Sequence, residues 1–394
     1  NMMVRKNLIL FTVVCCFFIA GCSSDPQLKI PDHIKKLENL TVISPNTEAS
    51  YSINFTRDAV FGESDEVVLG EITDMAVGNS GGVFIADGDQ NAIHSYKANG
   101  QYIQKMGQEG KGPGEFTGLH SLDHQGDRLY AFDEGQRRIS VFDLSSLSFS
   151  TVIPLSQENR DADNLPNAIP SGFHVRSDGT LLVQFNDTFA RGKEDTQQYT
   201  PYYLVDQEGK VISDKIHETK LADEIGDSDR MVFVRPPYGR QSLLTTGPAD
   251  NIYSSWTENF LIKKYNSNGE YQQAIYYPYE KAPLNISELV NEQYDSKMVR
   301  DVVRNADNPS TWPAMNTMTV DDERRLWIST ITDNKDTYQW WVISSKGDLL
   351  AKFSWPRSRS LEEVTNGNVY TRETDEQTGL EQIVRYSVDM SETD

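Results

Sequence analysis

Histidine and acidic side chains are the groups in this sequence that could bind a metal ion. The histidines are scattered, and no two stand at the spacing of a metal-binding pair: His33, His94, His120, His124, His174 and His217. Residues 87–91 have the oxygen-rich alternation of a calcium loop, with Asp87 and Asp89 as its acidic members. They lack the distal glutamate of an EF-hand. The sequence therefore favours a hairpin turn there, with calcium binding near Asp87 and Asp89 kept as the alternative.

Residues 234–240 could bind an anionic or aromatic group, because they place two guanidinium groups and a phenol ring in an acidic protein. Arg235 and Arg240 suit carboxylate or phosphate groups, and Tyr238 lies between them in sequence. Pairing of both arginines with nearby acidic residues is the alternative interpretation. Among the tryptophans, Trp256 and Trp312 fall near the expected loops rather than inside strands, so they are the candidates for stacking on a sugar ring.

The segment Ile-Ala-Gly-Cys at residues 19–22 resembles the lipobox of bacterial lipoproteins. Two basic residues and an apolar run at residues 8–19 precede it, and that run suits a signal-peptide core but is too short to span a bilayer. The resemblance implies that residues 1–21 are a signal peptide and that Cys22 carries lipid. By the same resemblance, Ser23 after the cysteine implies the outer membrane of the cell envelope. A secreted protein with an incidental Cys22 is the alternative.

Composition excludes several classes of partner and site. The chain has a formal net charge of -21, so nucleic acid and anionic membrane surfaces are poor partners. Cys15 and Cys16 fall inside the predicted signal peptide, so Cys22 is the one thiol expected in the mature chain, which leaves no disulfide framework. Residues 22–50 contain Pro26 and Pro31 among polar neighbours and are predicted to be the lipidated N-terminus and tether.

The rest of the chain repeats one structural unit. Residues 83–87 match residues 129–133, and residues 93–96 match residues 139–142, both at an offset of 46. Weaker copies follow along the chain at 180–206, 251–265, 326–344 and 368–387. Such a period suits a four-stranded blade, so residues 51–394 are predicted to form an all-β, six-bladed β-propeller. Residues 51–56 are expected to close the last blade, because the ring would otherwise leave sheet edges unpaired.

Gly107 and residues 110–116 resemble the inter-blade connection of NHL-type and TolB-like six-bladed propellers. Asp87 and Asp133 occupy the strand-end aspartate position of that family, and the resemblance covers roughly residues 70–145. The residues themselves predict structural roles, since glycine permits a positive φ in a tight turn and aspartate caps hairpin amides. Some propellers of this kind are lyases or hydrolases that hold a metal with channel histidines, which for this chain implies His94, His120 and His174.

The expected loops differ greatly in length between the two faces of the propeller. Turns between the first and second strands of each blade are short, whereas every insertion emerges on the opposite face: 154–172, 186–201, 216–242 and 278–316. Long loops on a rigid scaffold are typical of a binding surface. Residues 286–305 of the longest insertion are predicted to form a helix, with Asn285 as N-cap and Glu288 completing a capping box, that packs over the propeller rim.

These features predict a lipid-anchored binding or scaffold protein of the bacterial cell envelope. Its partner is expected to be a protein, a small molecule or a glycan, held on the insertion face by Arg235, Tyr238, Arg240, Trp256, Tyr294 and Trp312. The second hypothesis is a lyase or hydrolase whose channel histidines and aspartates hold a metal. Convergence of several such side chains in the central channel would separate the two, because the fold hosts both classes.

Overall fold

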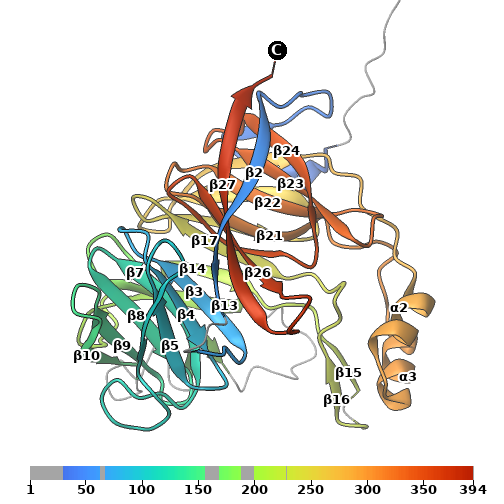
Figure 1. The fold of residues 1–394 in the computed structure, drawn as a ribbon. Helices are drawn as coiled ribbons and strands as arrows, with labels where there is room; N and C mark the ends of the chain where they lie inside the picture. The colour runs from blue at the N-terminus through green and yellow to red at the C-terminus, as the bar shows by residue number, and fades with distance from the viewer. Residues whose placement is uncertain (1–29, 63–66, 156–167, 188–198, 228, 394) are drawn as a thin grey trace, which may run out of the picture.

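The computed structural model describes residues 30–62, 67–155, 168–187, 199–227 and 229–393, and it is a six-bladed β-propeller (Figure 1). The first three blades, from the innermost strand outward, are β3 (Ile72–Val77), β4 (Val83–Asp87), β5 (Ala92–Tyr96) and β6 (Tyr102–Met106); β7 (Leu119–Gln125), β8 (Arg128–Asp133), β9 (Arg138–Asp143) and β10 (Ser148–Pro154); and β11 (Ala168–Val175), β12 (Leu181–Asp187), β13 (Tyr199–Val205) and β14 (His217–Lys220). The predicted fold class is confirmed.

The remaining three blades follow the same order. They are β17 (Ser242–Gly247), β18 (Asn251–Trp256), β19 (Phe260–Tyr265) and β20 (Tyr271–Tyr277); β21 (Met315–Val320), β22 (Leu326–Ile331), β23 (Thr337–Ile343) and β24 (Leu349–Pro356); and β25 (Ser360–Thr365), β26 (Asn368–Thr374), β27 (Glu381–Glu392) and β2 (Tyr51–Phe61). The hydrophobic core lies between neighbouring blades, where apolar side chains of adjacent sheets pack together.

The ring closes through its two ends, as predicted. Strand β2 pairs antiparallel with β27, from Tyr51 opposite Glu392 to Phe61 opposite Ile383, so the closing strand is longer than the expected 51–56. Figure 1 shows the two strands side by side. An ion pair between Asp58 and Arg385, with 2.8 Å between Oδ1 and Nε, joins them. Without β2 the last blade would have three strands, and the backbone groups of β27 would form an unpaired sheet edge. The pairing covers that edge.

Part of the predicted tether belongs to the propeller. Strand β1 (Leu40–Val42) adds a fifth, parallel strand to the outer edge of blade 4 by pairing with β20. Ile43 directly after it is 4 % exposed, because it enters the core between blades 4 and 5. A short helix, α1 (Asp32–Lys35), precedes this strand. Residues 1–29, which include the predicted signal peptide and Cys22, lie outside the described residues.

The longest insertion forms two helices where one was predicted, α2 (Ile286–Gln293) and α3 (Lys297–Asn305). The Asn285 side chain accepts a hydrogen bond from the Glu288 amide at 3.3 Å, which confirms the predicted N-cap. The first helix ends where Tyr294 is extended, and the second begins after Ser296, whose side chain makes no capping hydrogen bond. Within the described residues, no helix is long and apolar enough to cross a membrane.

Both helices pack on another insertion rather than lying flat over the propeller rim. Helix α3 contacts the hairpin strands β15 (Ile225–Asp227) and β16 (Val232–Val234), and α2 packs on α3. Figure 1 shows the four elements together at one edge of the ring. We call this group the satellite. Its small core buries Val290 and Val303 together with Tyr238. Two insertions that are distant in sequence thus bury each other's apolar surface.

Candidate functional site

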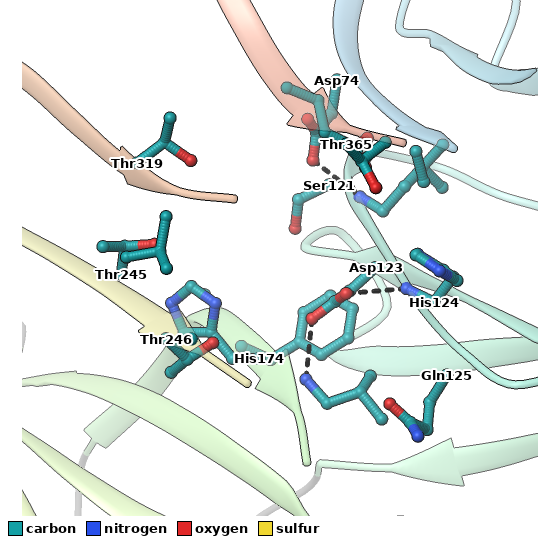
Figure 2. A pocket seen from close by; sticks show the side chains of 18 of the residues that line it. Asp74, Ser121, Asp123, His124, Gln125, His174, Thr245, Thr246, Thr319 and Thr365 are labelled. Atoms are coloured by element: carbon teal, nitrogen blue, oxygen red, sulfur yellow. Dashed lines mark hydrogen bonds between the residues drawn. The ribbon is translucent and has the colours of Figure 1, made fainter. Parts of the chain in front are cut away.

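A cavity of about 580 Å³ lies on the axis of the propeller. The inner strands of all six blades line it, as Figure 2 shows in close-up. The lining continues into the short turns between first and second strands, through residues such as Ser177, Asp250, Asp322 and Thr365. The cavity therefore lies toward the face opposite the insertions, where the sequence analysis did not expect a site. Its volume is in the range that holds a small molecule.

A β-bulge shapes the inner strand in five of the six blades. The strand register slips by one residue near the start of each, at Thr73, His120, Ser171, Asn316 and Glu362. A bulge re-aims the side chains that follow it and increases the local twist. The repeated bulge gives these five strands the same side-chain direction at the axis.

Side chains alternate after each bulge. The second residue after the bulge is apolar and buried between blades: Met75, Leu122, Phe173, Met318 and Val364. The first and third residues line the cavity in most blades, and many are polar: Asp74, Ser121, Asp123, His174, Thr319, Glu363 and Thr365. Because successive side chains of a strand point to opposite sides, one set builds the core and the other builds the cavity wall.

Carboxylates in this wall also join neighbouring blades. Asp123 accepts hydrogen bonds at 2.7 Å from its neighbour His124 and from the Val175 amide in blade 3. Asp322 accepts from the Asn366 amide in blade 6 at 3.0 Å. A carboxylate has about four acceptor positions, so these bonds leave lone pairs free for a ligand.

Burial raises the pKa of the acidic groups deepest in the channel. The pKa of Asp74 rises from 3.8 to about 7 and that of Asp123 to about 6, in both cases chiefly because burial disfavours the charged form. Burial also raises the pKa of Glu363 well above 4.5, and repulsion from Asp123 and Asp74 adds to it. All three residues are partly exposed rather than fully buried, as expected for residues that line an open cavity.

Neutral hydrogen-bonding groups complete the wall. Figure 2 shows the Ser121 hydroxyl and the His174 imidazole pointing into the cavity, with Thr245, Thr246 and Thr319 across from Asp123. Burial lowers the pKa of His174 to about 4, so its ring is neutral at pH 7 and offers one donor and one acceptor.

Two shielded hydroxyls in the lining have no hydrogen-bond partner among the described residues. Within the described part of the chain, no group hydrogen-bonds to the Oγ atoms of Ser121 and Ser171. Buried polar atoms in folded proteins are normally paired, so an unpaired set in a cavity wall points to a bound partner.

The cavity is strongly acidic. Seven carboxyl groups line it, at Asp74, Asp123, Asp250, Asp321, Asp322, Glu362 and Glu363, and none of the described lining residues is Lys or Arg. Arginines outside the lining approach three of them. Arg325 Nε lies 2.6 Å from Asp321, Arg176 Nε lies 3.8 Å from Asp250, and Arg372 Nε lies 3.1 Å from Glu362. The other four, Asp74, Asp123, Asp322 and Glu363, have no Lys or Arg nitrogen within 4 Å among the described residues.

The histidines of the enzymatic hypothesis do not gather at one place. His174 and His120 line the cavity, but His94 lies in β5, is 1 % exposed and faces Asp87 at 3.6 Å. In the described ranges, no group of three or more His, Cys, Asp or Glu side chains is arranged to hold a metal ion. His94 is thus buried in its blade and does not line the cavity with His120 and His174.

Asp87 and Asp133 make the same structural contacts in adjacent blades. Asp87 accepts hydrogen bonds from the Gly70 amide at 2.8 Å and the Gln90 amide at 2.9 Å. Asp133 does the same with the amides of Thr117 and Gln136, both at 3.0 Å. These are the hairpin caps predicted from the strand-end position. The oxygens of Asp87, the first residue of the calcium alternative, are thus occupied by backbone amides.

Two residues predicted to contact a partner, Tyr238 and Arg240, are buried between the two insertions. Tyr238 is 1 % exposed and donates a hydrogen bond to Asn308, and Arg240 is 6 % exposed. Arg240 binds Glu258 through Nε and donates to the carbonyl oxygens of Tyr238 at 3.0 Å and Thr311 at 3.1 Å. Their side chains are therefore not presented to a partner as expected. Burial of a charge requires such pairing, so Arg240 instead holds two insertions together.

The other candidates of that face are spread over several environments. Arg235 is exposed and lies 3.8 Å from Glu224, which matches the alternative of local pairing. Lys220 lies over the Trp256 ring, 4.0 Å from its centroid. Tyr294 and Trp312 pack at the edge of the satellite core.

Trp312 also lines a second cavity. This cavity has a volume of about 390 Å³ and lies between α2 and the blade 5 loop that carries Lys335, which pairs with Glu288 and Glu292 of the helix. The structure thus joins Tyr238, Tyr294 and Trp312 in one cluster and leaves Trp256 apart.

Sequence reasoning missed the channel carboxylates and hydroxyls. A signal was present, because several inner strands carry polar residues at alternate positions, as in residues 121–123, 317–319 and 363–365. The innermost strand of a blade is flanked by other blades, so a carboxyl group there is unusual for a purely packed position. The sequence analysis instead assigned the binding face from the difference in loop length, which is easier to see in a single sequence.

Comparisons with known proteins agree with the fold. The family model DUF5128, described as a 6-bladed beta-propeller, matches residues 63–231. A Bacteroides fragilis structure provisionally described as an exported protein is 14% identical, covers 90% of this chain and 100% of its own, and has a TM-score of 0.51. A Bacteroides vulgatus member of the DUF4221 family is 9% identical, with coverages of 88% and 100% and a TM-score of 0.51. No curated protein matches in sequence. Identities this low show the fold alone.

Proposed function

We propose that this chain is a binding protein that takes a small, hydroxyl-bearing solute into its central cavity. The observation that carries the proposal is the unpaired, shielded hydroxyl pair of Ser121 and Ser171 in the wall of a cavity of about 580 Å³. Carboxylates accept, and serine, threonine and neutral histidine both donate and accept, so the wall complements a solute with several hydroxyl groups.

The same proposal places the protein in the bacterial cell envelope. Its support is the lipobox-like segment that ends at Cys22, together with a fold neighbour described as exported. Lipid on Cys22 would anchor the chain at the outer membrane and leave the propeller as the solute-binding part. Binding without catalysis fits a wall whose acids already bridge neighbouring blades and so have a structural role.

The test of this proposal is a variant in which a larger side chain fills the cavity. Thr319 lines it, and Thr319→Phe adds a ring at the axis, whereas Thr151→Phe adds the same ring on the exposed outer strand β10. Titration calorimetry with glucose and glucosamine is expected to show binding to the wild type and to the Thr151→Phe control, with loss of binding in Thr319→Phe. Binding that survives in a folded Thr319→Phe variant, or no binding of either hexose to the wild type, overturns the proposal.

A further inference from the structure

We propose that the solute carries an ammonium group, which Asp74, Asp123 and Glu363 receive at the cavity wall. This inference rests on the proposed function and specifies the chemical class of its ligand as a polyhydroxylated amine, such as a hexosamine. Its first support is charge complementarity, since carboxyl groups line the cavity and no Lys or Arg is among its described lining residues. A cationic solute is the partner that such a field attracts.

The second support is the position of the three acids relative to one another. Asp74 lies in blade 1, Asp123 in blade 2 and Glu363 in blade 6, so they come from three consecutive blades on one side of the axis. Each of Asp74 and Asp123 disfavours ionisation of Glu363 by repulsion. Ionising all three together is therefore costly, and a cation placed among them removes that cost.

The third support is the hydrogen-bonding state of the acids. The two Asp74 oxygens accept one backbone bond each, from Met75 and Leu122, both at 2.8 Å. An ammonium group has three donors and no acceptor, so it can use the remaining lone pairs of several carboxylates at once. The blade contacts fix these carboxylates before a ligand arrives, which reduces the entropy lost on binding.

The fourth support comes from the groups around the acids. The Ser121 Oγ atom is shielded from solvent and unpaired, and Figure 2 shows it between Asp74 and Asp123. Its neighbour across the cavity is neutral His174, which adds no positive charge to compete with the ammonium group. A hydroxyl next to the amine would satisfy both groups, and this is the arrangement of a vicinal amino alcohol.

The test compares glucosamine with glucose, which share their hydroxyl pattern except where the amine replaces one. The wild type is expected to bind glucosamine at least ~10-fold more tightly, which corresponds to about 1.4 kcal/mol. Asp123→Asn keeps an acceptor for Val175 but removes the charge, so it is expected to bring the two affinities within about 3-fold. The control Asp389→Asn removes an exposed carboxylate outside the cavity and should keep the full preference.

Each other outcome has a defined meaning. Equal affinities for the two hexoses, both lost in Thr319→Phe, overturn the ammonium inference and leave the proposed function standing. No binding of either hexose overturns both. Competition of glucosamine by calcium chloride at equal concentration, but not by sodium chloride, would show a metal site and also overturn the inference. If Asp123→Asn fails to fold, Glu363→Gln with the same pair of hexoses decides the question.

Discussion

The Asp74 carboxylate of blade 1 accepts a hydrogen bond at 2.8 Å from the backbone amide of Leu122 in blade 2. The Val175 amide likewise donates to Asp123, and the Ser177 amide, in the turn after β11, donates to Asp250 in the turn after β17. Acidic side chains therefore join neighbouring blades at several boundaries near the axis. Inner strands of adjacent blades do not share a sheet, and such bonds give their amides partners. The cavity wall and the ring's cohesion thus depend on the same residues.

Replacing Asp74 should separate these two roles. Asp74→Ala leaves the Leu122 amide unpaired, so we expect the free energy of unfolding to fall by roughly 1–3 kcal/mol. Asp74→Asn retains one acceptor and should lose less. Urea denaturation of both variants beside Asp389→Ala measures the difference. An Asp74→Ala variant as stable as the control would contradict the bridging role.

Stability should fall as the pH rises from about 5 to about 8. The pKa of Asp74, about 7, and that of Asp123, about 6, lie above the usual 3.8, so the folded state binds more protons than the unfolded chain in this range. Their contribution is fully present below about pH 4 and is lost as the pH rises through 6 to 7. The expected loss is on the order of 1–3 kcal/mol.

The measurement for this pH effect is urea denaturation at several pH values. The double variant Asp74→Asn, Asp123→Asn should show a flatter dependence than the wild type, because neither amide titrates. Asp389→Asn should keep the wild-type slope. A stability that rises with pH in the wild type, or an unchanged slope in the double variant, would show that these acids are ionised in the folded state at low pH.

The variants Arg240→Ala and Arg235→Ala compare a buried with an exposed arginine next to the satellite. Arg240→Ala leaves Glu258 with one cation and breaks bonds to two carbonyl groups, so we expect a loss of roughly 3–5 kcal/mol. Arg235→Ala removes an exposed pair and should cost at most about 1 kcal/mol. Thermal unfolding compares the two. Similar losses for both variants would refute the assignment of Arg240 to the interior.

Removal of strand β2 should abolish cooperative folding. A chain that begins at residue 62 lacks the partner of β27 and exposes the long edge of blade 6, whereas a chain that begins at residue 30 keeps all described elements. Calorimetry should show a single sharp transition for the second chain and a broad or absent one for the first. An equally sharp transition in the shorter chain would argue against closure by β2.

Cys22→Ser should release the protein from membranes if Cys22 carries the lipid. We expect the variant to appear as a soluble or uncleaved species, while the unaltered chain partitions into detergent. Phase separation followed by mass measurement of the N-terminus distinguishes the forms. A processed variant that still enters the detergent phase would refute the lipid assignment.

The sequence by itself determined the repeat and therefore the architecture. The offset of 46 residues between matching strands indicates a four-stranded blade, and the alternating segment before the first blade indicates the closing strand. Both could be predicted because the alternation of apolar and polar residues is a local property of each strand. The Asn285 cap and the hairpin caps at Asp87 and Asp133 were predictable for the same reason, since their partners lie within a few residues or in the adjoining turn.

The tertiary structure alone decided which side chains meet. Asp74, Asp123 and Glu363 are separated by up to 289 positions in the chain, and only ring closure brings blades 6, 1 and 2 together at the axis. Likewise, the sequence predicted that Tyr238 and Arg240 contact a partner, but in the structure the insertion of residues 278–316 packs against them and buries them. Local patterns encode the blade and the polar positions of its inner strand, whereas the cavity forms only when the inner strands of six blades meet at one axis.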